Sequence, residues 1–419
     1  MAEPMRILWL TQHVWPRELG GVELCVDILS RRMVQAGCQV EIWCSGLAEG
    51  YEQRTSDGRL LVGLGLPRVP ARLWTLTPLW RMAHAARRLA GRGSADIVFC
   101  PSPILCCAAL AARIAAPVVY CPGGTIAGSS RWNFPTLEIG GLRGRIYSAL
   151  SLGRQHRLAE RRAVRRSAGV VVVSRRDRDQ LASVYSVPPR HIRVIYNGAD
   201  HQEFNPAPLA APPPDRPAGA LTVLTVARLH PIKNIEHLLR AWALVRWRPR
   251  RLWIVGDGVQ MESLRALAGE LGIADSVVFF GAQLDVRGLL RAADVFVLPS
   301  LYEACPLALL EAMAVGLPGI TLASVPGISD VAASDEINLD GQTGFVTDPR
   351  DPAALAGRLD LLAGDEPLRQ RLGQAALRRV AQHFTWAQAT QDYLHLARQL
   401  ACGRGGPAEW DPTWSVAHA

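Results

Sequence analysis

Short apolar runs alternate with amphipathic stretches along the whole chain. In the first half, this pattern predicts strands over residues 5–11, 39–45, 60–66, 95–100, 117–121, 169–174 and 192–197. In the second half, it predicts strands over 221–227, 251–256, 277–281, 295–299, 319–323 and 344–347. Between them, apolar residues recur at helical spacing, as over 22–35, 235–245, 262–271 and 353–362. Strands that alternate with helices predict an α/β fold with parallel sheets.

A proline-rich segment separates the two halves. Residues 205–220 contain six prolines, which are incompatible with a helix or a central strand and predict a semi-rigid linker. We therefore predict a first Rossmann-like domain over 1–204 and a second over 221–385. A last helical pattern covers 386–400, and the Gly-rich end, 401–419, is expected to be a flexible tail.

Length and charge narrow the functional classes. A chain of 419 residues favours two domains, and a net charge of +9 favours anionic partners such as a nucleoside diphosphate, an acidic membrane surface or nucleic acid. No nucleic-acid-binding module is recognisable, so nucleic acid is not expected as a partner.

The nine cysteines show no metal-ligand spacing. Their odd number, without a secretion signal, predicts reduced thiols in the cytoplasm. No apolar run is long enough to span a membrane, so membrane contact is expected to be peripheral at most, at the inner face.

The most informative segment is 299–318, in which Glu303 and Glu311 are separated by seven residues. A buried strand precedes it, Pro306 opens a helix, and the Gly316–Pro318 run ends that helix. Glu303 is thus predicted in a strand-to-helix loop and Glu311 on the first turns of the helix. Open α/β sheets bind ligands at that edge.

Two further segments have the same strand-to-helix position. Arg228 and Lys233 follow the first strand of the second half, where two cations and a helix amino end can neutralise a diphosphate. Gly20 and Gly21 follow the first strand of the chain and open its first helix, where backbone amides favour an anion. No dinucleotide-binding G-x-G-x-x-G follows any predicted strand.

These segments resemble the retaining, nucleotide-sugar-dependent glycosyltransferases of family four. Residues 299–318 resemble their E-x7-E motif, and 226–234 resemble their G-R-L-x-x-x-K-G element, with Ala227 and Asn234 in place of glycines. Residues 20–23 are similar to their GGxE loop, 194–206 to their hinge, and 253–258 and 341–346 to two structural turns. The resemblance implies a GT-B fold, with two Rossmann-like domains facing a cleft and the last helix crossing back to the first domain.

The resemblance also implies roles for residues. Glu303 would hold the hydroxyls of the transferred sugar, Glu311 the ribose, and Arg228 and Lys233 the diphosphate without a metal; Glu303, Arg228 and Lys233 would carry catalysis. The implied donor-binding set is Gly20, Gly21, Arg228, Lys233, Glu303, Ala304, Cys305, Pro306, Leu307 and Glu311. No cofactor is implied beyond the nucleoside-diphosphate sugar itself. The acceptor would be a hydroxyl of a small molecule, a glycan or a lipid-linked sugar, held by the first domain.

One position departs from the family pattern. Family members place a histidine after the fifth strand of the first domain, whereas this chain has Cys121 and Gly123 there. His13 could supply an imidazole from another loop. The departure keeps open a non-catalytic sugar-nucleotide-binding protein and a GT-B epimerase-like enzyme as alternatives.

Two other patterns have structural interpretations beside functional ones. Asp177 and Asp179 match a D-x-D metal motif, but they begin a helix that Ser174 would cap. A basic stretch over 154–166, and another with Trp74 and Trp80, are interpreted either as solvated helix faces or as contacts with anionic lipid.

Overall fold

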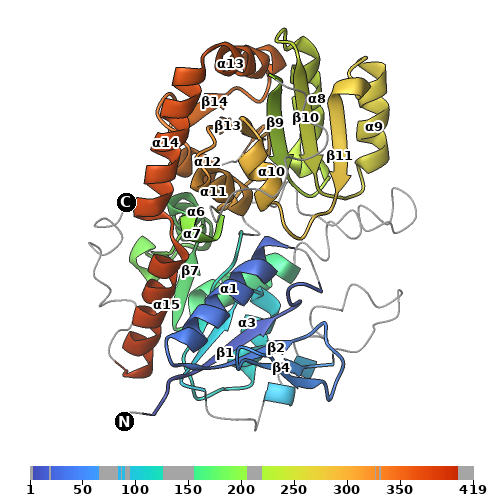
Figure 1. The fold of residues 1–419 in the computed structure, drawn as a ribbon. Coiled ribbons are helices and arrows are strands. Elements are labelled where there is room, and N and C mark those ends of the chain that lie inside the picture. Colours follow the sequence, from blue (N-terminus) through green and yellow to red (C-terminus); the bar gives the residue numbers. More distant parts are fainter. Residues whose placement is uncertain are drawn as a thin grey trace. The chain divides into compact units, whose positions relative to one another are not determined.

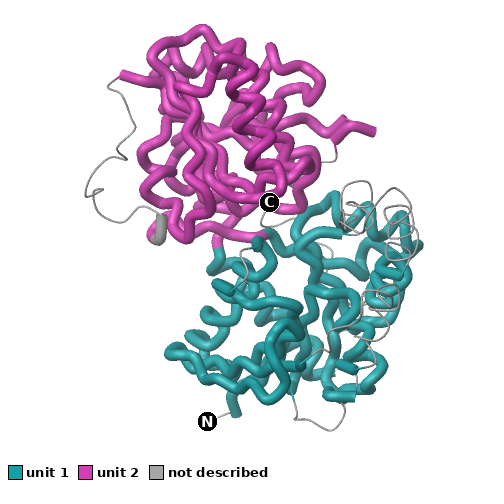
Figure 2. The backbone as a smooth tube through the Cα atoms, turned by 90° about the vertical axis from the view of Figure 1, so that its right-hand side faces the viewer, with its two compact units in different colours: residues 1–196, 386–419 teal, residues 197–385 magenta. Residues whose placement is uncertain are grey.

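The chain forms two compact units (Figure 2). The computed structural model describes residues 3–17, 20–65, 84–85, 87–89, 95–125, 155–204, 219–325, 327–329 and 332–403. Unit 1 comprises Met1–Tyr196 and Trp386–Ala419, and unit 2 comprises Asn197–Thr385. The sequence placed the end of the first domain at residue 204, whereas the chain passes from unit 1 to unit 2 at residues 196 and 197. Most of the proline-rich segment, 205–218, and residues 404–419 of the tail lie outside the described residues.

Unit 1 is built on an eight-stranded sheet with the order β3-β4-β2-β1-β5-β6-β7-β8. Figure 1 labels β1, β2, β4 and β7 of this sheet. Its strands are β1 (Arg6–Thr11), β2 (Gln39–Cys44), β3 (Glu52–Arg54), β4 (Leu60–Gly63), β5 (Ile97–Cys100), β6 (Val118–Tyr120), β7 (Gly169–Val172) and β8 (Ile192–Val194). All neighbours are parallel except β3, which runs antiparallel to β4. The sequence pattern missed β3 because its three residues are polar and exposed, without an apolar face.

The helices of unit 1 are α1 (Gly21–Gln35), α3 (Pro103–Ala111), α6 (Arg175–Tyr185) and α15 (Trp386–Ala401), together with the turn η2 (Pro189–His191) and helical residues 155–166. Although α15 is the last of the described helices, it packs beside α1. Its Tyr393 ring lies 6.0 Å from Trp9 and 5.3 Å from Phe99, centroid to centroid. This aromatic cluster explains why α15 belongs to unit 1, since such rings bury large apolar areas.

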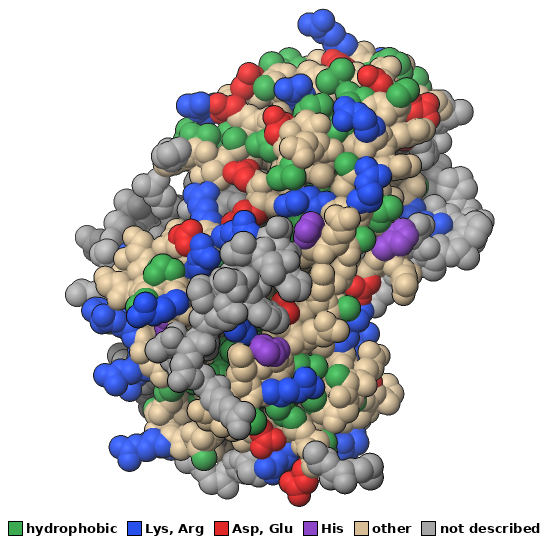
Figure 3. All heavy atoms as spheres, turned by 90° about the vertical axis from the view of Figure 1, so that its left-hand side faces the viewer, with side chains coloured by type: hydrophobic (Ala, Val, Ile, Leu, Met, Phe, Trp, Pro, Cys, Tyr) green, Lys and Arg blue, Asp and Glu red, His purple; other side chains and the backbone are tan. Residues whose placement is uncertain are grey.

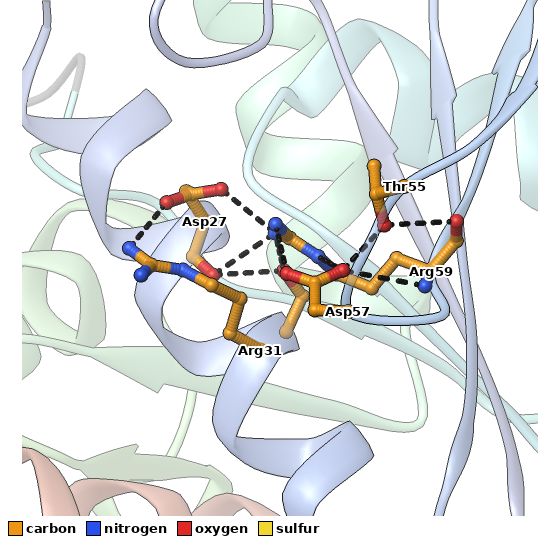
Figure 4. Close-up of polar contacts among 6 residues, drawn as sticks. Asp27, Arg31, Thr55, Asp57 and Arg59 are labelled. Carbon is orange, nitrogen blue, oxygen red and sulfur yellow. Dashed lines mark hydrogen bonds and ion pairs between the residues drawn. The ribbon is translucent and has the colours of Figure 1, made fainter.

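A buried ionic cluster attaches the β3–β4 turn to α1 (Figure 4). Arg59 is 7% exposed and donates from Nη1 to Asp27 Oδ1 at 2.7 Å and from Nη2 to Asp57 Oδ2 at 2.6 Å. Hydrogen bonds and the charge of Arg59 lower the pKa of Asp57 to about 2 despite its partial burial. Asp27 also accepts from the exposed Arg31 at 2.6 Å, four residues along α1.

Unit 2 is built on a six-stranded parallel sheet with the order β11-β10-β9-β12-β13-β14. Its strands are β9 (Leu221–Val226), β10 (Arg250–Val255), β11 (Val277–Gly281), β12 (Val295–Leu298), β13 (Gly319–Leu322) and β14 (Gly344–Thr347). Its helices are α7 (His201–Phe204), α8 (Ile235–Leu244), α9 (Met261–Glu270), α10 (Arg287–Ala292), α11 (Leu307–Ala314), α12 (Ala332–Ile337), α13 (Pro352–Gly364) and α14 (Glu366–His383), with the turns η3 (Pro231–Lys233) and η4 (Ala274–Ser276).

Local sequence signals account for these elements. Asp351 caps α13 by accepting from two backbone amides, and Asp365 caps α14 in the same way through Leu368. The four residues of β12 are all buried, as expected for an apolar strand inside a parallel sheet. Each predicted strand is present in the structure, and the prediction of parallel-sheet α/β units is confirmed.

Candidate active site

The order of strands in unit 2 brings two predicted site segments together. From β9 the chain builds β10 and β11 on one side, then crosses to β12 on the other side. The carboxyl ends of β9 and β12 therefore flank a topological switch point, where open α/β sheets bind ligands. Arg228 and Lys233 follow β9, and Glu303 follows β12.

An ion pair joins these two loops. Lys233 Nζ donates to Glu303 Oε1 at 2.6 Å, and the two side chains are 21% and 10% exposed. The backbone contributes a second link, since the Leu301 amide donates to the Ile232 carbonyl at 2.8 Å. A lysine and a glutamate that were predicted from separate motifs thus form one partly buried charged pair.

Arg228 adds positive charge at the same place. Its side chain is exposed and has no hydrogen-bond or ion-pair partner among the described residues. The sequence analysis did not select His230, which lies in the same loop. Burial, and then the charges of Arg228 and Lys233, lower the pKa of its imidazole. Its Nδ1 accepts weakly from the Ile232 amide at 3.4 Å and so caps η3. His230 is therefore neutral at pH 7. Because Lys233 is paired with Glu303, the positive charge of this loop that has no carboxylate partner among the described residues is that of Arg228.

Asn234 occupies a position where the family element has glycine. Its φ is 52°, in the left-handed region, and it stands between η3 and the first residue of α8. Asparagine tolerates this conformation better than other residues with a side chain. The substitution is thus compatible with the turn that carries Lys233.

Glu311 is placed on α11, five residues into the helix. It is half-buried and has no hydrogen-bond or ion-pair partner in the described part of the chain, and burial raises its pKa to about 7. An acid without a partner is costly in the free protein, which is typical of groups that await a ligand.

The turn between Glu303 and α11 is held from a distant segment. Ala304, Cys305 and Pro306 are buried, Leu307 is half-buried, and α11 has no side-chain cap. Asn197 Nδ2 donates to the Cys305 carbonyl at 3.0 Å. The sequence analysis placed Asn197 only within the hinge-like segment 194–206, because nothing in the sequence relates it to residue 305.

Two glycines support the loop that carries Arg228. Gly256 and Gly258 follow β10 with φ angles of 133° and 156°. A Cβ atom on Gly258 would lie 2.3 Å from the Leu229 carbonyl oxygen, and one on Gly256 would lie 1.9 Å from that of Ala227. Only glycine permits this close approach of two backbones.

Gly258→Ala is therefore expected to destabilise the protein by about 2 kcal/mol, because the backbone at 227–229 has to move and φ is strained. Chemical denaturation measures this change. Gly269→Ala is the matched control: it lies on α9, its added Cβ meets nothing within 4 Å, and we expect a gain of up to about 1 kcal/mol. Equal stability of both variants would contradict the packing described here.

The remaining predicted site residues lie at the carboxyl edge of the unit 1 sheet. Gly20 is the N-cap of α1 and Gly21 its first residue. A Cβ on Gly20 would lie 2.1 Å from Glu23 Oε2, so the carboxylate of the GGxE loop reaches back over the glycine. Gly123 packs against the same turn, since a Cβ there would lie 2.5 Å from Val22 Cγ2.

His13 and Cys121 differ in their access to solvent. His13 is exposed at the end of β1, beside Gly46. Cys121 is 6% exposed, and burial together with Cys106 raises the pKa of its thiol well above the usual range. Cys121 thus presents neither an imidazole nor a thiolate. All nine cysteines lie in the described ranges and are free thiols.

The D-x-D match lies at the start of a capped helix. Ser174 Oγ accepts from the Asp177 amide at 3.1 Å and so caps α6, as predicted. No group of three or more potential metal ligands occurs within the described residues. Among those residues, no helix is long and apolar enough to cross a membrane.

Comparisons with known proteins agree with this geometry. Residues 19–203 match the family model Glycosyltransferase Family 4, and residues 211–379 match Glycosyl transferases group 1. The D-inositol 3-phosphate glycosyltransferase of Saccharomonospora viridis is 33% identical over 301 residues, covering 67% of this chain and 68% of that protein. That of Streptomyces avermitilis is 29% identical over 440 residues, covering 95% and 89%. Sucrose-phosphate synthase from Thermosynechococcus elongatus has a similar structure, with a TM-score of 0.76, 21% identity and coverage of 95% and 100%.

The protein is a glycosyltransferase with the GT-B fold. It belongs to family four, as the resemblance of its motifs predicted.

Proposed function

We propose that the protein is a retaining enzyme that transfers a sugar from a nucleoside-diphosphate sugar to an acceptor hydroxyl. The observation that carries this proposal is the Lys233–Glu303 pair at the switch point of unit 2, with exposed Arg228 beside it. A cationic loop and a carboxylate on neighbouring strand ends can bind the two chemically different parts of such a donor.

We assign each of these residues to one part of the donor. Arg228 and Lys233 neutralise the diphosphate, and Glu303, oriented by Lys233, accepts hydrogen bonds from hydroxyls of the transferred sugar. Glu311 accepts from the ribose hydroxyls. The backbone amides of Ala304, Cys305 and Leu307, at the start of α11, complete the binding of oxygen atoms in unit 2. We assign no metal to the donor.

The reaction follows from these assignments. The bond between the anomeric carbon and the diphosphate oxygen breaks, and a bond to the acceptor oxygen forms on the same face of the sugar. The acceptor proton passes to the departing diphosphate oxygen, so the protein needs no nucleophile. Arg228 and Lys233 lower the barrier because negative charge grows on the diphosphate as it departs.

The two relatives suggest the acceptor class. Both are named for D-inositol 3-phosphate, so we propose a phosphorylated cyclitol as the first acceptor to test. Other acceptors with a hydroxyl, including glycans and lipid-linked sugars, form the comparison set.

The donor is tested by thermal melting with UDP, GDP, ADP and dTDP and their sugar conjugates, with and without EDTA. A native-state ligand raises the melting temperature by linkage. We expect one base to stabilise the protein, and EDTA to leave the shift unchanged. If no nucleotide stabilises the protein, the donor assignment is wrong.

Catalysis is tested separately, by analysing products with the stabilising donor and inositol 3-phosphate. Transfer with retention, seen as an α-glycoside by NMR, is the expected result. The absence of a histidine at Cys121 favours one alternative, a non-catalytic sugar-nucleotide-binding protein. That alternative predicts binding without transfer to any acceptor.

Glu311 makes nucleotide affinity depend on pH. Its pKa of about 7 in the free protein means that half of it is protonated at neutral pH, and the ribose hydroxyls need the charged form as acceptor. The affinity for the nucleotide should therefore decrease as the pH falls below 7, by up to about tenfold for each pH unit. Above pH 7 the affinity should stay nearly constant. Calorimetric titration between pH 5.5 and 8.5 measures this dependence. Glu311→Gln should bind more weakly at pH 8 and show a flat profile, and an unchanged slope would contradict the assignment.

The free protein should show the opposite dependence on pH. Because the folded-state pKa of Glu311 is raised, its contribution to stability is present below the unfolded pKa, near 4.5, and is lost as pH rises through 7. Glu311→Gln should therefore remove this loss of stability between about pH 4.5 and 7, which chemical denaturation across that range measures.

We also propose that the protein works in the cytoplasm and contacts the anionic inner face of a membrane. Its nine free thiols suit a reducing compartment. Helical residues 155–166 expose one face with five arginines and Leu158, which is 58% exposed. The arginines are Arg157, Arg161, Arg162, Arg165 and Arg166, and none has a carboxylate partner among the described residues. On the face drawn in Figure 3, Lys and Arg side chains are interspersed with Asp and Glu side chains.

Replacing Arg161 and Arg165 by glutamine should lower binding to phosphatidylglycerol vesicles at least tenfold, because each surface arginine contributes about 1 kcal/mol. Vesicle co-sedimentation at physiological salt measures it. Arg371→Gln with Arg378→Gln, exposed on α14, is the control of equal charge and should have no such effect. Equal loss in both pairs would indicate a general charge effect.

A further inference from the structure

His230 lies between the two cations that we assign to the diphosphate, in the segment that joins β9 to α8. Its backbone amide donates to the Arg228 carbonyl at 2.8 Å, and its carbonyl accepts from the Lys233 amide at 2.8 Å. These two bonds close successive tight turns, so the three residues belong to one compact loop. The G-R-L-x-x-x-K-G element leaves the position of His230 unspecified, and the resemblance to family four therefore assigns no role to it.

Backbone bonds to two other loops fix the residues on either side of this histidine. The Leu229 amide donates to the Asp257 carbonyl at 2.8 Å, and the Gln260 amide donates to the Leu229 carbonyl at 3.1 Å. From the loop after β12, the Leu301 amide donates to the Ile232 carbonyl at 2.8 Å. The half-buried imidazole is therefore carried by a rigid turn.

The imidazole of His230 carries one proton, and its contacts place that proton on Nε2. Nδ1 accepts weakly from the Ile232 amide at 3.4 Å, which requires Nδ1 to be without a proton. The ring is neutral at pH 7, because burial and the charges of Arg228 and Lys233 lower its pKa. The tautomer is therefore Nε2–H, and this donor has no acceptor among the described residues.

The charged groups near this imidazole favour an anionic acceptor. The charges that act on its pKa are those of Arg228 and Lys233, and both are cations. The two loops packed against it bring two carboxylates, and both have other partners. Glu303 accepts from Lys233 at 2.6 Å, and Asp257 accepts from the Gly258 amide at 2.7 Å. A neutral N–H donor with a cation before and after it in the loop is suited to an oxygen atom of a phosphate.

We propose that His230 is a third ligand of the diphosphate, donating a hydrogen bond from Nε2–H to a phosphate oxygen. This inference rests on the proposed function, because it requires that Arg228 and Lys233 bind a diphosphate. The imidazole supplies direction rather than charge, since it donates along one N–H bond, whereas a lysine ammonium has three rotatable donors. His230 thus orients the diphosphate that the two cations neutralise.

Two substitutions separate the roles of the two ring nitrogens. His230→Asn keeps an acceptor near the position of Nδ1, and asparagine is a good residue for a helix start, but this variant has no donor at the position of Nε2. His230→Gln is long enough to place an amide N–H near the position of Nε2. The Nδ1 contact that glutamine loses is weak, so we expect thermal melting to show that both variants are folded.

Calorimetric titration at about pH 8 measures the binding of whichever of UDP, GDP, ADP and dTDP stabilises the wild type. We expect His230→Asn to weaken this binding at least tenfold, the usual effect of losing a hydrogen bond to a charged group, and His230→Gln to restore most of the affinity. Histidine-selective NMR adds a readout that a structural role would not change. The signal that His230→Asn removes should show the Nε2–H tautomer in the free protein, and its Nε2 resonance should shift when the nucleotide binds.

The proposal is overturned if His230→Asn binds the nucleotide as tightly as the wild type, or if His230→Gln binds no more tightly than His230→Asn. An Nε2 resonance that the nucleotide leaves unchanged also overturns it. Arg228→Ala distinguishes these failures from failure of the proposed function. If Arg228→Ala weakens binding and His230→Asn does not, the diphosphate site stands and only the role of His230 falls. If neither variant weakens binding, or if the wild type binds none of the four nucleotides, both proposals fall.

Discussion

Arg228→Ala is expected to lower kcat by about 10²- to 10³-fold, the usual effect of removing one group that stabilises charge developing in a transition state. The loss should appear in kcat more than in KM, because the diphosphate gains charge only as the sugar departs. Steady-state kinetics with the donor identified by thermal melting measures both constants.

The structure makes this a clean experiment. The Arg228 side chain is exposed and makes no hydrogen bond or ion pair with the residues that the structure describes, so its removal should leave the melting temperature unchanged. Lys233 is less suitable, because its removal would leave Glu303 as a buried charge without its partner. Arg240→Ala is the matched control, since it removes an exposed arginine of α8 whose ion pair among the described residues is with Glu236, and it should retain wild-type kinetics. Wild-type kcat in Arg228→Ala would disprove the diphosphate role.

Arg59→Ala is expected to destabilise the protein by about 3–5 kcal/mol, because it leaves the carboxylates of Asp27 and Asp57 without their buried partner. Arg31→Ala is the control on the same carboxylate. Arg31 pairs with Asp27 on the surface of α1, and its loss should cost less than about 1 kcal/mol. Chemical denaturation of both variants measures the difference, and similar losses would contradict a special role for the buried cation in Figure 4.

The same cluster predicts a dependence of stability on pH. The folded-state pKa of Asp57 is depressed to about 2, so its contribution is present above its unfolded pKa, near 3.8, and is lost as pH falls through 2. Arg59→Ala should remove this part of the acid sensitivity. The wild type and Arg59→Ala should therefore differ most in their free energy of unfolding between pH 4 and 7.

The predictions that succeeded from sequence alone depend on short-range signals. Apolar runs defined every strand except β3, which is short and polar, and capping residues such as Ser174 identified helix starts. The resemblance of residues 299–318 and of the Arg228–Lys233 element predicted the family because their residues are close together along the chain, and the family is confirmed.

Other features depend on which strands become neighbours. Lys233 and Glu303 are 70 residues apart, and only the crossover from β11 to β12 places their loops side by side. Asn197 reaches Cys305 over 108 residues, and Arg59 reaches Asp27 over 32. No local pattern indicates such pairs.

By itself, the sequence thus determined the order of the elements, the class of fold and the family, and it supplied the residues that we propose bind a nucleotide sugar. The tertiary structure alone decided which of those residues share an edge, how deeply each is buried and which charges remain without a partner. The physical reason is that hydrophobic periodicity and capping act within a few residues, whereas ion pairing and desolvation depend on distances in space. The raised pKa of Glu311 and the buried guanidinium of Arg59 are therefore properties of the fold, which their positions along the chain do not reveal.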